Sequence, residues 1–222
     1  MKTFIFFFGP PASGKGTQIE LLMKKASFKI ISIGKLLREE RKKRSEIANL
    51  IKLHLDKGEL VPDEIVELII DKELKKIGAN EKIIFDGFPR NQNQLTLLDN
   101  RLKKISSKDD KIYAIYVRID SQEIKRRLGG RRSCECGSTY HIEFNAPKKT
   151  GVCDSCEKKL FTRADDNSRV ISERIKIFQT EFGPIMSYWK KKNILIEING
   201  EQDIKVVSAD IENELRDLKI IK

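Results

Sequence analysis

Residues 9–17, which read GPPASGKGT, have the types and the spacing that suit a bound phosphate chain. Gly9, Gly14 and Lys15 match the pattern of two glycines with four residues between them and a lysine after the second. Glycines let backbone N–H groups curl around an anion, and the start of a following helix adds partial positive charge. Lys15 would bring an ammonium group to the terminal phosphates. The usual serine or threonine after the lysine is replaced by Gly16, and Thr17 follows. This segment predicts a nucleoside triphosphate site.

The four cysteines of the chain all fall within one stretch, as Cys134 and Cys136 in SCECGSTYH and as Cys153 and Cys156 in GVCDSC. Clustered cysteines in a cytoplasmic protein favour a metal over disulfides. Four thiolates satisfy the tetrahedral preference of zinc and leave no open position for chemistry, so we expect one structural Zn²⁺. The spacing C-x-C is one residue shorter than usual. Zinc on three cysteines with another ligand, such as His141, and no metal at all are the alternatives.

Arginines could bind several phosphates at once, because the planar guanidinium donates hydrogen bonds in pairs. The candidates are Arg38, Arg90, Arg127, Arg131, Arg163 and Arg174. Asp86 follows an apolar run and could orient Mg²⁺ or its waters. Transfer between phosphates needs no general base, since the acceptor oxygen is already anionic. We therefore expect no acid–base role for His54 or His141.

Composition bounds the class of protein. The chain has 222 residues, a formal net charge of +11 and 39% hydrophobic residues, which suits a folded protein with an anionic partner. No apolar run reaches the 18 residues or so that a membrane-spanning helix needs. The run at residues 4–8 is too short for a signal peptide and favours a buried strand. We expect a cytoplasmic protein.

Short apolar segments alternate with helical patterns along the chain. Strands are predicted at residues 4–8, 28–33, 82–86, 111–119 and 194–200, and helices at 35–44, 46–57, from Pro62 onward, and after the last strand to about 218. Gly58 is placed to end the second of these helices. This alternation predicts an α/β fold with a parallel five-stranded sheet and helices on both faces.

The stretches GPPASGKGTQ, DGFPR, GRR, TRADDN and NGEQD occur in an order that resembles the adenylate kinases with a long lid, over almost the whole chain. The resemblance implies transfer of a phosphoryl group from ATP to AMP, giving two ADP, with Mg²⁺ as cofactor and a monomeric protein. It also implies a P-loop core at residues 1–31, 62–129 and 167–222, a helical monophosphate-binding insertion at 32–61, and a cysteine-containing lid at 130–166.

The resemblance assigns residues to each nucleotide. Arg38 and Arg90 would hold the phosphate of AMP, Arg127 and Arg131 would reach ATP, and Arg163 and Arg174 would span the transferring group. Residues implied in catalysis are Lys15, Asp86, Arg90, Arg131, Arg163 and Arg174. Residues implied to contact ATP are Gly9, Ala12, Ser13, Gly14, Lys15, Gly16, Thr17, Arg127, Arg131, Thr139, Tyr140 and Gln202. Residues implied to contact AMP are Ile33, Arg38, Glu59, Leu60, Val61, Gly87, Phe88, Pro89, Arg90, Gln94, Arg163 and Arg174.

Two positions depart from the family pattern. Ile33 and Lys35 stand where these kinases usually have threonine and aspartate. The stretch DGFPRNQNQ also resembles the UMP/CMP kinases, which are the alternative. Gln94 and the long lid favour AMP, because an amide can pair with adenine through one donor and one acceptor.

Two other classes are weighed against a kinase. A nucleic-acid-binding ATPase would use the cysteines as a zinc ribbon, but we would then expect aromatics and lysines on one face, and this stretch also carries several acids. The second class is a nucleotide-sensing relative without activity, suggested by Lys35. We expect small-molecule nucleotides as partners, with neither nucleic acid nor membrane.

Overall fold

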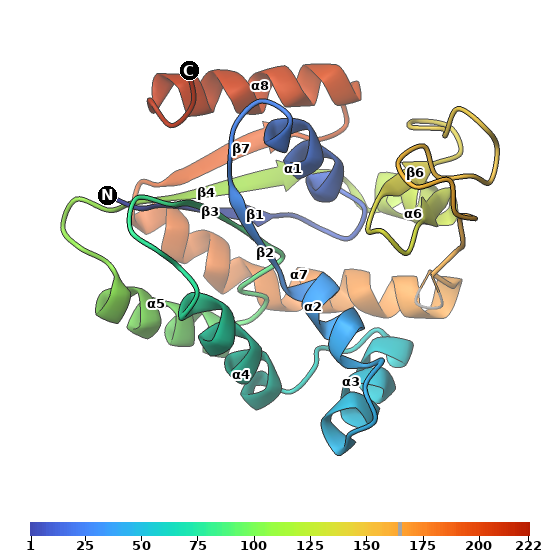
Figure 1. Ribbon diagram of the computed structural model, residues 1–222, viewed down its shortest axis with the longest axis horizontal. Helices are drawn as coiled ribbons and strands as arrows, with labels where there is room; N and C mark the ends of the chain where they lie inside the picture. The colour runs from blue at the N-terminus through green and yellow to red at the C-terminus, as the bar shows by residue number, and fades with distance from the viewer. Residues whose placement is uncertain (164–165) are drawn as a thin grey trace.

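The computed structural model describes residues 1–163 and 166–222. Its core is a five-stranded parallel sheet in the order β2-β3-β1-β4-β7 (Figure 1). The strands are β1 (Thr3–Phe8), β2 (Lys29–Ser32), β3 (Lys82–Asp86), β4 (Lys111–Arg118) and β7 (Leu195–Asn199). The predicted parallel sheet is confirmed, and β1 lies at its centre with its C-terminal end leading into the phosphate loop.

Helices cover both faces of this sheet. In Figure 1, α1 (Lys15–Met23) and α8 (Ile204–Asp217) lie above it, and α4 (Asp63–Leu74), α5 (Gln92–Ile105) and α7 (Ser168–Lys191) lie below. The side chains of β1 alternate between the two layers. Phe4, Phe6 and Phe8 pack in the larger cluster with α7, and Ile5 and Phe7 pack in the cluster with α1 and α8. This two-sided burial explains why the strand is a continuous apolar run.

Aromatic rings fix the centre of the larger cluster. The ring of Phe6 lies 4.7 Å from that of Phe85 and 5.3 Å from that of Trp189, measured between centroids. All three side chains are almost completely buried. Each such side chain contributes about 1.5–3 kcal/mol of hydrophobic stabilisation, so the strand ends that carry the phosphate loop and Asp86 rest on a rigid base.

An insertion of two helices, α2 (Ile33–Glu40) and α3 (Glu46–Lys57), follows β2. The predicted bounds of α3 are confirmed: Ser45 caps it by accepting from the backbone N–H of Ala48, and Gly58 ends it with a φ of +78°. The prediction for α2 was two residues late at its start and four too long at its end. Ile33 is the first residue of this helix and not the last residue of the strand. Its apolar side chain is buried in the core from that position, so an apolar residue here was not evidence for a longer strand.

The segment after α6 (Ser121–Gly129) forms a small separate unit. It begins with an antiparallel pair of strands, β5 (Arg131–Ser133) and β6 (Thr139–His141), which the sequence pattern did not predict. Tyr140 of β6 and Leu160 pack with Cys134, Cys153 and Cys156 in a cluster of their own. Within the described part of the chain, none of the helices combines the length and the apolarity that crossing a membrane requires.

Candidate active site

The phosphate loop follows β1 and depends on its glycines. Gly9 has a φ of +147°, and a Cβ there would lie 2.5 Å from the carbonyl oxygen of Val117, so no other residue fits without a shift of the neighbouring strand. Gly14 has a φ of +91° and caps α1, which begins at Lys15. The loop therefore ends at a helix N-terminus, whose unpaired backbone N–H groups suit an anion.

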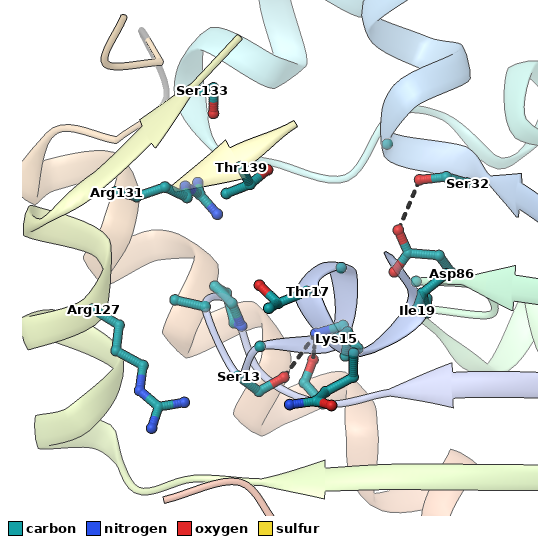
Figure 2. Close-up of a pocket in the computed structure, with 18 of the residues that line it drawn as sticks. Ser13, Lys15, Thr17, Ile19, Ser32, Asp86, Arg127, Arg131, Ser133 and Thr139 are labelled. Atoms are coloured by element: carbon teal, nitrogen blue, oxygen red, sulfur yellow. Dashed lines mark hydrogen bonds between the residues drawn. The ribbon is translucent and has the colours of Figure 1, made fainter. Parts of the chain in front are cut away.

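Lys15 lies folded over this loop (Figure 2). Its ammonium donates to the carbonyl oxygens of Gly9 at 2.8 Å and Pro10 at 2.9 Å, and to the hydroxyl of Ser13 at 3.0 Å. These partners are neutral groups of the loop itself. A bound phosphate chain would offer Lys15 charged oxygens in place of these neutral ones, and hydrogen bonds to charged acceptors are stronger.

The electrostatic environment of Lys15 is that of a cation among cations. The pKa of Lys15 is lowered to about 7, chiefly by burial; the charges of Arg90, Arg174 and Arg131 act in the same direction, and Asp86 opposes them. Three arginines from the loop after β3, from β5 and from α7 therefore converge on one point of the loop. Such a cluster of positively charged groups is the arrangement that phosphates would stabilise.

Asp86 ends β3 beside the phosphate loop (Figure 2). It accepts a hydrogen bond of 2.8 Å from the hydroxyl of Ser32, at the end of the neighbouring strand β2. This contact fixes the rotamer of the carboxylate at the C-terminal edge of the sheet. A carboxylate held there, near a phosphate loop, fits Mg²⁺ or the waters around it.

Arg131 of the lid and Arg174 of α7 share one buried carboxylate. The side chain of Asp166 is fully buried, accepts from Nε of Arg131 at 2.8 Å, and lies 3.7 Å from Nη1 of Arg174. Nε of Arg163 donates to the hydroxyl of Ser133 at 2.7 Å. These contacts hold each guanidinium in place, as buried charges require.

On the acceptor side, Arg38 of α2 and Arg90 of the loop after β3 converge on Gly34. A Cβ on Gly34 would lie 3.2 Å from Nη1 of Arg38 and 3.6 Å from Nη2 of Arg90. Nε of Arg90 also donates to the carbonyl oxygen of Gly87 at 2.8 Å. Two guanidinium groups that meet over a bare glycine backbone suit one phosphate group.

Both sides open into one cavity of about 1680 Å³. That volume exceeds the roughly 300–1,000 Å³ of a typical single-ligand pocket, so it can hold two nucleotides. All of the residues implied to contact ATP line it, namely Gly9, Ala12, Ser13, Gly14, Lys15, Gly16, Thr17, Arg127, Arg131, Thr139, Tyr140 and Gln202. Asp86 and eight residues of the acceptor set line it as well: Arg38, Glu59, Leu60, Gly87, Pro89, Arg90, Arg163 and Arg174.

The other four residues predicted to contact AMP lie buried behind the cavity wall. Ile33, Val61 and Phe88 belong to the hydrophobic core. Gln94 is 3% exposed, and both ends of its amide are engaged: Nε2 donates to Asp63 at 2.9 Å, and Oε1 accepts from the backbone N–H of Arg90 at 2.9 Å. The amide keeps one further N–H and one further lone pair, but the side chain is buried and does not line the cavity.

The four cysteines come together in the lid. Sγ of Cys134 lies 3.3 Å from that of Cys156, Sγ of Cys136 lies 3.6 Å from that of Cys153, and all four sulfurs are within 4.8 Å of one another. Thiolates at 2.3 Å from a tetrahedral zinc would be about 3.8 Å apart, so the donor set fits this metal. Hydrogen bonding to Tyr140 lowers the pKa of Cys153 to about 5, which favours the metal-binding thiolate, whereas burial and hydrogen bonding to the other sulfurs raise the pKa of Cys134 to about 12.

Comparison with known proteins agrees with this geometry. The family model for adenylate kinase matches residues 7–194. The chain is 41% identical to the adenylate kinase of Methanocella arvoryzae over 212 residues, which cover 95% of this chain and 97% of that protein. The identities are 37% with the adenylate kinase of Archaeoglobus fulgidus (97% and 99% covered) and 38% with that of a Geobacillus species (95% and 97% covered). The chain belongs to the adenylate kinase family. It is therefore a nucleoside monophosphate kinase, a phosphotransferase.

Sequence reasoning missed several polar residues that support this kinase site. Asp63 accepts from the amides of Asn91, Asn93 and Gln94, with distances of 2.9 to 3.3 Å. Glu123 accepts from Nε of Arg127 at 2.7 Å. The sequence offered no signal for Asp63, because it lies about thirty residues before the amides that it accepts from.

An aromatic ring near the donor side was missed as well. Phe144 lies 4.5 Å from the guanidinium carbon of Arg126 and 5.5 Å from that of Arg127, and it also packs against His141. Phe144 lines the cavity. The sequence offered no signal for this contact, because the lid hairpin that places Phe144 had not been predicted.

Proposed function

We propose that this adenylate kinase family member catalyses reversible phosphoryl transfer from ATP to AMP, giving two ADP. The observation that carries the proposal is the convergence of Lys15 and the arginines Arg90, Arg131 and Arg174 on one phosphate loop, in a single cavity that the proposed ATP and AMP residues both line. Transfer between two nucleotides brings many negative charges together. Preorganised cations that neutralise this charge can supply most of the catalysis.

Each charged group has a proposed role. Lys15 and the backbone of the phosphate loop bind the terminal phosphates of ATP, and Arg127 and Arg131 reach the same nucleotide. Arg38 and Arg90 hold the phosphate of AMP. Arg163 and Arg174 lie against the transferring group. No general base is required, because the attacking oxygen of AMP is already ionised, so these groups need only position the two nucleotides and stabilise their charge.

Mg²⁺ is proposed as the cofactor that accompanies ATP. Asp86, held by Ser32, is the carboxylate that would orient the ion or its waters, and Thr17 supplies a hydroxyl near the start of α1. When bound, Mg²⁺ withdraws charge from the phosphate oxygens during transfer. The role of the protein groups is to bind and orient.

The three proposed parts of the chain are the core at residues 1–31, 62–129 and 167–222, the monophosphate-binding insertion at 32–61, and the lid at 130–166. The element boundaries support this division, because α6 ends at Gly129 and α7 begins at Ser168. A monomer in the cytoplasm remains our expectation.

A structural Zn²⁺ on Cys134, Cys136, Cys153 and Cys156 is proposed to hold the lid together. The lid has a small apolar cluster of its own, so metal binding would supply much of its folding free energy. Metal analysis should give close to one zinc per chain. Chelation should lower the melting temperature of the lid and leave the core folded.

Two outcomes would contradict the zinc site. One is substoichiometric metal in protein that stays equally stable with EDTA. The other is full zinc content in a Cys134→Ser variant, which would point to a different fourth ligand.

The acceptor is tested by a coupled assay of ATP with AMP, GMP, UMP and CMP at equal concentrations. AMP should give the highest kcat/KM. Faster turnover with UMP or CMP would overturn the AMP assignment in favour of a UMP/CMP kinase, and no turnover with any of the four would reject catalysis. If the protein instead binds to heparin, is released by modest salt and shows no turnover, the nucleic-acid-binding class would be favoured.

A further inference from the structure

Lys35 reaches from the acceptor helix to the lid. It lies in the first turn of α2, where members of this family usually have aspartate. A Cβ on Gly137 would lie 3.6 Å from Nζ and 3.9 Å from Cε of Lys35. Gly137 is about a hundred residues further along the chain, so this contact joins two parts that the sequence keeps apart.

Gly137 belongs to the turn that carries the first two cysteines. The backbone N–H of Gly137 donates to the carbonyl oxygen of Cys134 at 3.0 Å. The backbone N–H of Cys134 donates in turn to the carbonyl oxygen of Ser138 at 3.0 Å. Lys35, Cys136 and Ser138 line the same cavity. The ammonium of Lys35 therefore lies beside the tight turn of residues 134–138, which we name the cysteine knuckle.

The charge of the knuckle is opposite to that of Lys35. Four thiolates around one Zn²⁺ carry a net charge of −2, and Glu135 adds a carboxylate, itself 3.1 Å from Lys158. An aspartate at position 35 would face this negative group and be repelled. A lysine is attracted to it, which gives the departure from the family pattern a physical reason.

We propose that Lys35 is a positioning residue that holds the lid against the acceptor helix through attraction to the zinc-loaded cysteine knuckle. The inference rests on the proposed phosphoryl transfer and on the proposed zinc. Lys35 touches neither nucleotide in this role. It acts through the lid arginines, because closure of the knuckle onto α2 brings Arg131 and Arg163 over the cavity that Arg38 and Arg90 also line.

The test compares Lys35→Ala, Lys35→Glu and Lys35→Arg with Lys52→Ala and Lys52→Glu. Lys52 is an exposed lysine on α3, in the same insertion, that does not line the cavity. The first readout is the rate of zinc transfer to a chromophoric chelator, with AMP and the non-hydrolysable analogue AMP-PNP both saturating. Lys35→Ala should release zinc about two- to fivefold faster than wild type, as expected for one exposed charge contact, and Lys35→Glu faster still. Lys35→Arg and both Lys52 variants should match wild type.

The second readout is the division between KM and kcat. Lys35→Ala should raise KM for AMP by about two- to fivefold while kcat stays at or above that of wild type, because a looser lid opens more easily. Salt of about 0.5 M should make wild type behave like Lys35→Ala, since an exposed contact is screened.

Three results would overturn the inference. The first is a Lys35→Glu variant that matches Lys52→Glu in both readouts. The second is a Lys35→Arg variant as defective as Lys35→Ala, which would indicate a steric role. The third is wild-type protein without zinc, because the charge that Lys35 should meet would be missing. Failure of the proposed function is separate: it appears as wild type that does not convert ATP and AMP.

Discussion

The donor side and the acceptor side of the cavity are built in different ways. The donor side takes its central groups from one continuous run, residues 9–17, between β1 and α1. The acceptor side takes its groups from the first turns of α2, the turn before α4, and the loop after β3. All residues expected on the donor side line the cavity, whereas Ile33, Val61, Phe88 and Gln94 of the acceptor side lie behind its wall.

This difference shows which features of the site follow from neighbouring residues in the sequence and which depend on tertiary packing. In the phosphate loop, backbone N–H groups and glycine conformations make the site, and both follow from neighbouring residues. On the acceptor side, the direction of each side chain depends on how separate helices pack on the sheet. A motif can name the segment there, but tertiary packing decides which residue of the segment faces the ligand.

The largest effects should come from removing the charges of each side. Lys15→Ala and Arg90→Ala should each lower kcat/KM by roughly 10²–10³-fold or more, because each charge stabilises the transferring phosphate. Arg90→Ala should also raise KM for AMP, whereas Lys15→Ala should leave it near normal. Steady-state kinetics with each nucleotide varied, and thermal melting, measure these outcomes. Near-normal turnover of Arg90→Ala with an unchanged melting temperature would remove Arg90 from the site; Lys52→Ala is the control.

The second prediction concerns Asp63, which holds the acceptor loop. Asp63→Ala leaves the amides of Asn91, Asn93 and Gln94 without their shared acceptor, so we expect the free energy of unfolding to fall by about 1–3 kcal/mol. KM for AMP should rise and KM for ATP should not change. Asp71→Ala is the matched control, since Asp71 joins α4 to α5 through Arg101 at 2.7 Å, away from the loop. Equal KM values for AMP in the two variants would mean that Asp63 only stabilises the fold.

The fold was predictable from sequence, because apolar runs such as β1 are buried on both faces and glycines such as Gly58 end helices for local reasons. The paired strands of the lid were not, because β5 and β6 are three residues each and too short for a periodic pattern. The cluster of four cysteines was predictable from spacing alone. The engagement of Gln94 was not, since its partner Asp63 lies some thirty residues earlier.

The third prediction uses the pKa of Lys15, lowered from 10.5 to about 7 by burial. Between pH 7 and pH 10.5 the unfolded chain keeps the proton that the folded chain has lost, so this group makes the free energy of unfolding rise with pH in that window. Bound phosphate should raise the pKa again. ATP binding at pH 8 should therefore take up close to one proton, and affinity should fall by up to about tenfold per pH unit above pH 7.

Calorimetry in buffers of different ionisation enthalpy measures this proton uptake. Lys15→Arg is the control, since a guanidinium stays charged throughout this range. Proton uptake that persists unchanged in Lys15→Arg would assign the titration to another group.

The smallest effect on AMP binding is expected at position 33, where the family pattern and the structure lead to different predictions. The pattern of the family predicts that Ile33→Thr restores a hydrogen bond to AMP and tightens binding by up to about tenfold. The structure buries Ile33 to 2% exposure in the core, so a hydroxyl there would lack both a ligand and apolar contacts. We expect Ile33→Thr to lower the free energy of unfolding by about 1–2 kcal/mol and to change AMP affinity by less than about threefold.

Ile33→Val, which removes one methylene and adds no hydroxyl, separates the packing loss from the polar one. A tenfold gain in AMP affinity with Ile33→Thr, but not with Ile33→Val, would mean that the acceptor side turns this residue toward the nucleotide when AMP binds.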